Sequence, residues 1–288
     1  MMKFLKYQHS YYQQVCDFLI EINKEGSHHM NWNWARWEWM YEHALTRKDL
    51  LSHMGLWFDG DHLVGVALMD MYFGEAFIGV LQPYSYLYQE VLKYAFQNLK
   101  DEQGLGVTIA NEATNEIEEA IKQGFDKQDK AEVISEIRLD CDFLVSLPLG
   151  FTIEEYDAQA NPLEWEWLMW QGFDNGNNKE EFLKQFKQPT RNRPHFNSSL
   201  CVVIRNREGL PVAGACSWYD DRTDYAYLEP VFVIPSYRKK GLGKIVVYTT
   251  MNQARKLGAK RMIVNSDQLF YRHLGFIEKY RYFFYWKR

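Results

Sequence analysis

Residues 228–247 read LEPVFVIPSYRKKGLGKIVV, an apolar strand followed by a proline turn, a basic glycine-rich segment and the start of a helix. The β-branched and aromatic residues before Pro235 predict the strand, and this proline ends it because it lacks an N–H donor. An amphipathic helix is predicted to begin near Gly241. Glycine lets the backbone approach a ligand closely, and the first N–H groups of a helix have no partner inside it. The segment is therefore typical of an anion-binding site.

Spacing separates three phosphate-binding motifs that could explain this segment. A Walker-type loop requires Ser or Thr after Gly-Lys to hold magnesium, whereas Gly243 and Lys244 precede Ile245. A dinucleotide-binding fingerprint requires a glycine three residues after Gly243, where this chain has Val246. The third motif is Arg/Gln-x-x-Gly-x-Gly/Ala after a strand that ends in Val-x-Pro. The chain matches it at Val233, Pro235, Arg238, Gly241 and Gly243.

A second signature follows this one. Asn265 ends a short predicted strand, and residues 270–276 read FYRHLGF, which resembles Phe-Tyr-x-x-Leu-Gly-Phe. Either signature alone is common, since aromatic-Leu-Gly-Phe is also an ordinary helix end. In this order, about thirty residues apart, the two signatures resemble those of the GNAT N-acyltransferase superfamily. The resemblance implies an α/β fold (α+β, with a mixed sheet), in which a twisted mixed β-sheet is flanked by helices, and acetyl-CoA as co-substrate.

Length and charge limit the other function classes. A chain of 288 residues with 47% hydrophobic residues is expected to form two domains. The formal net charge of −5 and the pI of about 5.9 argue against a broad nucleic-acid or anionic-lipid surface. No signal peptide and no long apolar run is seen, so we expect a soluble, cytoplasmic protein that does not bind a membrane.

Cysteine and histidine show no ligand spacing. The four cysteines are expected to be reduced, buried thiols, and no metal site is predicted. The tryptophans form two clusters at helical spacing, at 32–39 and 165–170, and are expected to be structural. The last strand, 280–287, is aromatic on both faces and is expected to pack between domains or to line the acceptor cleft.

The two halves of the chain resemble each other at four places, with offsets of 149 to 152 residues. The matches are Phe4–Tyr7 with Ile153–Tyr156, Leu63–Ala67 with Leu210–Ala215, Pro83 with Pro235, and Gln123–Phe125 with Leu274–Phe276. A strand-like run, 133–143, ends before Pro148 and Gly150, where a boundary is expected. We therefore expect two tandem GNAT-like domains, 1–146 and 150–288.

Only the second half carries the motifs. Where it has residues 238–243, the first half has 84–89, with no glycine and no cation. Where it has Phe270 and Tyr271, the first half has Glu119 and Ala120. The first half is thus expected to be a degenerate GNAT domain that shapes the substrate cleft or stabilises its neighbour. A polar loop, 174–178, and the segment 189–199 interrupt the helices of the second half, and the latter is expected to border the substrate cleft.

The resemblance assigns the cofactor site to the third core strand and the glycine-rich turn. Strand backbone groups would pair with the pantetheine, and N–H groups of the turn would hold the pyrophosphate. Four cations around one helix N-terminus suit the negative charge of coenzyme A. The implied cofactor-binding residues are Phe232, Val233, Arg238, Lys239, Lys240, Gly241, Leu242, Gly243, Lys244 and Asn265. Asn265 would bond the pantetheine or cap the helix after it.

Two residues are candidates for proton transfer. Transfer to an amine requires the neutral amine, and Glu229 is the best-placed base, although it would need burial or a water relay to be effective. It could instead attract the substrate ammonium. Tyr271 matches the family tyrosine that protonates the departing thiolate.

The expected function is N-acetyl transfer from acetyl-CoA to a primary amine, by direct attack in a ternary complex. The acceptor is expected to be a small-molecule or peptide amine, with no nucleic-acid partner, and the protein a monomer or homodimer. Two alternatives are a non-catalytic acyl-CoA-binding regulator and an aminoacyl-tRNA-dependent transferase. The regulator would not need Glu229 and Tyr271, and the transferase would need a nucleic-acid surface.

Overall fold

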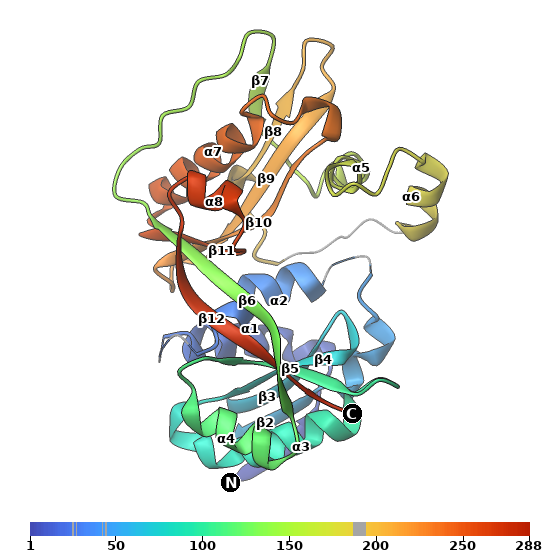
Figure 1. Cartoon of the computed structure of the whole chain (residues 1–288), viewed down its shortest axis with the longest axis vertical. Helices are drawn as coiled ribbons and strands as arrows, with labels where there is room; N and C mark the ends of the chain where they lie inside the picture. The colour runs from blue at the N-terminus through green and yellow to red at the C-terminus, as the bar shows by residue number, and fades with distance from the viewer. Residues whose placement is uncertain (25, 27, 42, 44, 187–193) are drawn as a thin grey trace.

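The N-terminal half of the computed structural model is a mixed sheet with helices on both sides (Figure 1). The structure describes residues 1–288 except 25, 27, 42, 44 and 187–193. The strands of this half are β1 (Met2–Lys6), β2 (Gly55–Asp59), β3 (His62–Asp70), β4 (Tyr72–Val80), β5 (Leu105–Ala110) and β6 (Asp126–Arg138). Its α-helices are α1 (Tyr12–Ile22), α2 (Trp34–Tyr41), α3 (Tyr88–Asn98) and α4 (Thr114–Lys122).

The C-terminal half repeats this order of elements. Its strands are β7 (Thr152–Glu155), β8 (Cys201–Arg205), β9 (Pro211–Tyr219), β10 (Tyr225–Val233), β11 (Arg261–Asn265) and β12 (Ile277–Lys287). Its α-helices are α5 (Pro162–Gly172), α6 (Lys179–Gln185), α7 (Leu242–Leu257) and α8 (Leu269–His273). Among the described residues, no helix is long and apolar enough to cross a membrane.

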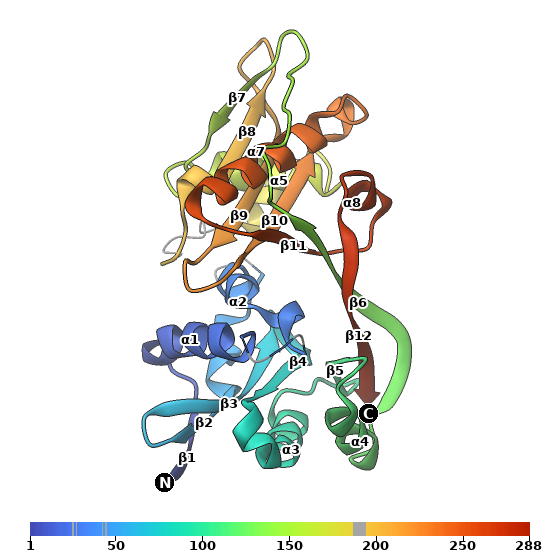
Figure 2. The same cartoon turned by 90° about the vertical axis from the view of Figure 1, so that its left-hand side faces the viewer.

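The two halves exchange their last strands. The sheet order is β1-β2-β3-β4-β5-β12-β6-β11-β10-β9-β8-β7, so β12 inserts between β5 and β6, while β6 pairs with β11. Figures 1 and 2 show these two long strands running from one half into the other. Backbone hydrogen bonds therefore join the halves into one continuous sheet. The expected boundary at 146–150 divides the sequence, whereas the sheet is shared across it.

The four internal matches fall on corresponding elements. They lie on β1 and β7, on β3 and β9, in the short helical turns Gln82–Leu87 and Pro235–Tyr237, and after α4 and α8. In each half, one parallel strand pair, β4–β5 or β10–β11, is hydrogen-bonded near its start. The α/β fold with tandem mixed sheets is therefore as predicted.

Alternating residues of β8 face different helices. Val202 and Ile204 pack in the cluster that contains the buried face of α7, whereas Cys201 and Val203 pack in the cluster that contains Trp165 of α5. This period of two is the ordinary pleat of a strand buried on both faces. The helices thus cover opposite faces of the C-terminal sheet.

The prediction for the cysteines is wrong at three of four positions. Cys201 and Cys216 are directly opposite in the β8–β9 pairing and form a disulfide. Cys141 is exposed, and Cys16 is buried as expected. Two residues become cross-strand neighbours through the register of their strands, and the spacing of the cysteines in the sequence did not reveal that register.

The aromatic clusters are structural, as predicted. Trp34 and Trp37 of α2 and Trp165 of α5 are buried in the cores. The last strand, β12, packs between β5 and β6 of the other half, which confirms the first of the two expectations for it. The strand expected at 133–143 is present but begins and ends earlier, as β6.

Candidate active site

A bulge in β10 opens the sheet at the site. The β10–β11 pairing ends at Tyr227, and the β10–β9 register shifts between Leu228 and Val231. Pro230 has no N–H to donate to a ladder, so it fits only at such an irregularity. The Trp218 indole N–H donates to the carbonyl of Glu229 (2.8 Å) and holds the bulge. The end of β10 is thus separated from β11, which leaves space for a ligand between them.

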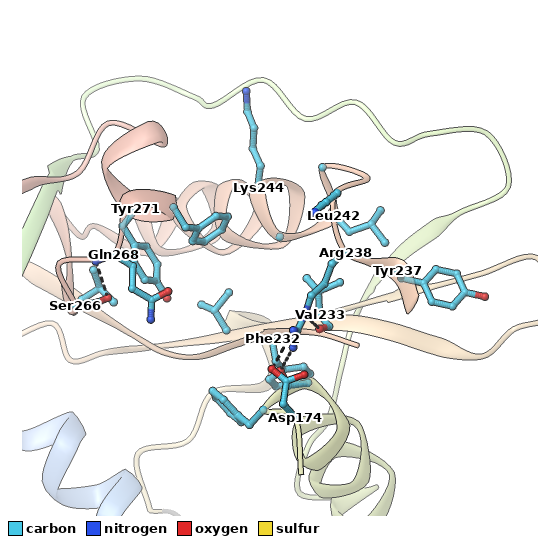
Figure 3. A pocket seen from close by; sticks show the side chains of 18 of the residues that line it. Asp174, Phe232, Val233, Tyr237, Arg238, Leu242, Lys244, Ser266, Gln268 and Tyr271 are labelled. Carbon is cyan, nitrogen blue, oxygen red and sulfur yellow. Dashed lines mark hydrogen bonds and ion pairs between the residues drawn. The ribbon is translucent and has the colours of Figure 1, made fainter. Parts of the chain in front are cut away.

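The space is a cleft of about 760 Å³ (Figure 3). One end is lined by the turn before α7 and the other by the segment from β11 to α8. Of the predicted site residues, eleven of twelve line it: Glu229, Phe232, Val233, Arg238, Lys239, Gly241, Leu242, Gly243, Lys244, Asn265 and Tyr271. Lys240 does not, and its ammonium lies over the Tyr237 ring, 4.9 Å from the centroid.

The N-terminus of α7 faces the cleft with unpaired donors. Gly241 precedes the helix with φ of 81°, a left-handed conformation that favours glycine, and a Cβ there would meet nothing within 4 Å. The first helical bond runs from the Ile245 N–H to the Gly241 carbonyl (3.2 Å). In the described chain, the N–H groups of residues 242–244 therefore have no backbone partner, as expected at a helix start. This geometry can receive an anion.

The cations are less free than the sequence suggested. Arg238 donates to the carbonyls of Val233 (3.0 Å) and Gly172 (2.8 Å) and to the Asp174 carboxylate (2.9 Å). It therefore ties the end of β10 to the end of α5. The Lys244 ammonium lies over the Tyr248 ring, 5.0 Å from its centroid. This turn therefore attracts phosphate mainly through its backbone N–H donors and the helix dipole, and less through free cationic side chains.

Glu229 lies on the bulge, lines the cleft and is partly buried. Burial raises its pKa to about 7, and the nearby Arg36 guanidinium opposes this rise. A carboxylate of this pKa is a far better base at neutral pH than an exposed glutamate. Glu229 was expected to need burial or a water relay to act as a base, and its burial meets this condition.

Tyr271 lies on α8 and is buried. Its ring contacts Phe270 and Phe276, with centroids 5.0 and 5.6 Å away, and its side chain lines the same cleft as Glu229. Burial and, secondarily, the Glu229 carboxylate raise the pKa of the phenol. The phenol is therefore neutral at neutral pH and can donate a proton.

Asn265 does not cap the following helix. That helix begins after Gln268, and the Ser266 hydroxyl accepts from the Gln268 N–H (3.2 Å). With its amide oxygen toward the N-terminal half, Asn265 accepts from Arg36 (3.0 Å) and donates to the Val133 carbonyl (3.2 Å). Its side chain is thus engaged by the other half while the residue lines the cleft.

Several lining residues were missed. Ser266 and Gln268 had no distinct signal, whereas Asp174 lies in the loop that the sequence analysis singled out. The segment expected to border the cleft, 189–199, lies partly outside the described residues, and its described part does not line the cleft. There, His195 binds Glu38 of α2 through its backbone N–H (2.8 Å) and its ring (2.5 Å).

The corresponding region of the N-terminal half has different chemistry. A cleft of about 600 Å³ lies there, lined by the turn 82–89 and by Glu112, Glu116 and Glu119. The described lining residues include no lysine or arginine. Carboxylates repel a pyrophosphate, so only the C-terminal cleft suits one.

Comparison with known proteins also distinguishes the C-terminal half. Residues 162–276 match the model of the acetyltransferase (GNAT) family. Residues 162–276 therefore form a GNAT-family domain. The match covers the elements from α5 to α8, which include every lining residue of the cleft. Members of this family are acetyltransferases that use acetyl-CoA as co-substrate.

Solved structures show the same tandem fold. A tandem GNAT protein from the clavulanic acid biosynthesis pathway is 12% identical to this one, with a TM-score of 0.63, and the alignment covers 100% of this chain and 98% of the other. A GCN5-related N-acetyltransferase from Sphaerobacter thermophilus (12% identity, TM-score 0.59, covering 99% and 95%) and a GNAT-family acetyltransferase from Colwellia psychrerythraea (13%, 0.58, covering 100% of both) are also similar. At these identities, the likeness shows the fold alone. No curated protein matches its sequence.

Proposed function

We propose that this protein transfers the acetyl group of acetyl-CoA to a primary amine by direct attack in a ternary complex. One observation carries the proposal: a single cleft contains the donor-lined start of α7, the separated end of β10, Glu229 and Tyr271. The proposed cofactor site consists of the eleven lining residues named above without Glu229 and Tyr271. The phosphates of acetyl-CoA would accept from the N–H groups of residues 242–244, and its pantetheine would lie along Phe232 and Val233.

The reaction would proceed without a covalent enzyme intermediate. The amine nitrogen attacks the thioester carbonyl carbon, and Glu229, directly or through water, takes the proton that the nitrogen loses. The tetrahedral intermediate then collapses as the carbon–sulfur bond breaks. The sulfur leaves as a thiolate and takes a proton from Tyr271, since a neutral phenol can donate it at neutral pH.

Titration calorimetry with acetyl-CoA tests the assignment of the cleft. We expect one binding site for each chain, because the N-terminal cleft carries carboxylates where the C-terminal cleft has a phosphate-binding turn. Two sites of similar affinity would contradict the degenerate role of the N-terminal half. Binding without transfer to any amine would favour the regulator.

The pH dependence of transfer tests the base. Because the deprotonated form of Glu229 is the active one and its pKa is about 7, kcat/KM should rise as the pH increases through about 7 and then level off. Glu229→Gln should lower the plateau by roughly 100-fold and remove this rise. The assay uses an acceptor whose own amine pKa lies outside the range tested. An unchanged pH profile in the variant would assign the rise to another group.

A further inference from the structure

A charged side chain of the N-terminal half, Arg36, reaches the wall of the cleft in the C-terminal half. Arg36 lies on α2, and its side chain is only 13% exposed. Burying a guanidinium is costly unless it is fully paired. Its partners therefore indicate what this charge does at the junction.

Within the N-terminal half, those partners come from three segments. Arg36 donates to the Asn31 carbonyl (2.9 Å), to both carboxylate oxygens of Glu132 on β6 (3.0 Å each) and to Asp70 at the end of β3 (3.0 Å). The guanidinium also lies over the Trp32 ring, 5.0 Å from its centroid. Glu132 is itself held by the Asn31 amide (2.8 Å). Such a network holds the guanidinium in one place.

The same guanidinium touches the wall of the cleft. It donates to the Asn265 amide oxygen (3.0 Å) at the end of β11, next to Ser266. The Ser135 hydroxyl of β6 donates to the Ser266 carbonyl (2.7 Å). Both Asn265 and Ser266 line the cleft together with Glu229 and Tyr271. Residues of the N-terminal half therefore hold the segment that joins β11 to α8.

Arg36 also acts on the candidate base. The groups that interact electrostatically with Glu229 are Arg36 of α2, Tyr227 of β10 and Tyr271 of α8, and Glu132 of β6 acts on the same Tyr227. Arg36 is the cation among them, and it lowers the pKa of Glu229 against the effect of burial. Without this charge, the carboxyl would be more protonated at neutral pH.

We propose that Arg36 is a positioning residue through which the N-terminal half prepares the C-terminal site, by holding Asn265 in the cleft wall and placing a fixed positive charge near Glu229. As far as it concerns transfer, this inference rests on the proposed function. It gives the half without a phosphate-binding turn a defined role: the site is incomplete without α2.

The charge can be tested without any turnover. In full-length protein labelled with [δ-¹³C]glutamate, the Glu229 carboxyl resonance is identified as the one lost in Glu229→Gln, and its pKa is measured by NMR titration. Arg36→Gln should raise that pKa above the wild-type value, whereas Arg36→Lys, which keeps the charge, should leave it closer to wild type. Arg222→Met is the matched control. Arg222 also joins the halves, through Asp17 (2.6 Å), but it does not line the cleft.

Kinetics supplies the second readout. In Arg36→Gln, the rise of kcat/KM with pH should move to higher pH, with a loss of roughly three- to tenfold at pH 7 that largely disappears above pH 9. A merely structural role would lower activity equally at every pH. Arg36→Gln leaves the partly buried carboxylates of Glu132 and Asp70 without their cation. If this variant does not fold, the double variant Arg36→Gln, Glu132→Gln, which also removes one of the two carboxylate charges, takes its place.

The two proposals fail separately. The role of Arg36 would be overturned if the pKa of Glu229 did not change in Arg36→Gln or in the double variant. It would also be overturned if this pKa changed as much in Arg222→Met. A titration that moves as expected in a protein that acetylates no amine would support the electrostatic role and overturn the proposed function.

Discussion

Replacing Gly241 with aspartate is expected to weaken acetyl-CoA binding by at least roughly 100-fold, equivalent to about 2.8 kcal/mol. Gly241 stands directly before α7 with φ of 81° and open space in front of its Cα. A carboxylate there would face the pyrophosphate and compete for the N–H groups that should bind it. The measurement is calorimetric titration of acetyl-CoA into wild type and variant.

Gly209→Asp is the matched control for this substitution. Gly209 also has a positive φ, 76°, and no atom within 4 Å of an added Cβ, but it does not line the cleft. Its variant carries the same charge and a similar backbone strain, so it should bind acetyl-CoA like wild type. Equal weakening in both variants would mean that strain, and not the site, explains the loss.

Tyr271→Phe is expected to lower kcat by roughly 100-fold or more, while acetyl-CoA binding changes by no more than about threefold. The ring packs between Phe270 and Phe276, and phenylalanine keeps that packing while removing the only proton that the side chain can donate. The thiolate would then leave without its proton donor. Steady-state kinetics together with a binding titration separates the two effects.

Tyr248→Phe controls for the loss of a tyrosine hydroxyl. Tyr248 lies on α7 in the same half, and its hydroxyl donates to the Leu274 carbonyl at a distance of 3.5 Å. Its variant should keep nearly full activity, since the residue does not line the cleft. If Tyr271→Phe were as active as this control, the thiolate would have to be protonated by another group or by water.

Local sequence signals predicted the part of the site that is local in the chain. The strand before Pro235, the left-handed Gly241 and the helix after it follow from residues within one short segment. The same signals overestimated how many cationic side chains are free to bind phosphate. The three acceptors of Arg238 include Gly172 and Asp174, more than sixty residues away, and its pairing with them depends on the tertiary fold.

Features that depend on tertiary pairing were not predictable in this way. The exchange of β6 and β12 depends on which strand fills each gap in the sheet, and this is decided by long-range pairing and not by residues within one short segment. Arg36 joins Glu132 and Asn265 across 96 and 229 positions of the chain, with no spacing that could suggest it. The burial of Glu229, which raises its pKa, and the opposing charge of Arg36 also depend on the tertiary fold.

An assay of acetyl transfer is the most direct test of the proposed function. Wild-type protein is incubated with acetyl-CoA and a panel of primary amines that includes antibiotic amines, polyamines, amino acids and peptide N-termini. Release of free thiol is followed, and the acetylated amine is identified by mass spectrometry. We expect amine-dependent thiol release that saturates in the wild type and is lost in both Gly241→Asp and Tyr271→Phe. Thiol release that is equal in wild type and both variants, or no acetylated product from any amine despite tight acetyl-CoA binding, would contradict the proposed function.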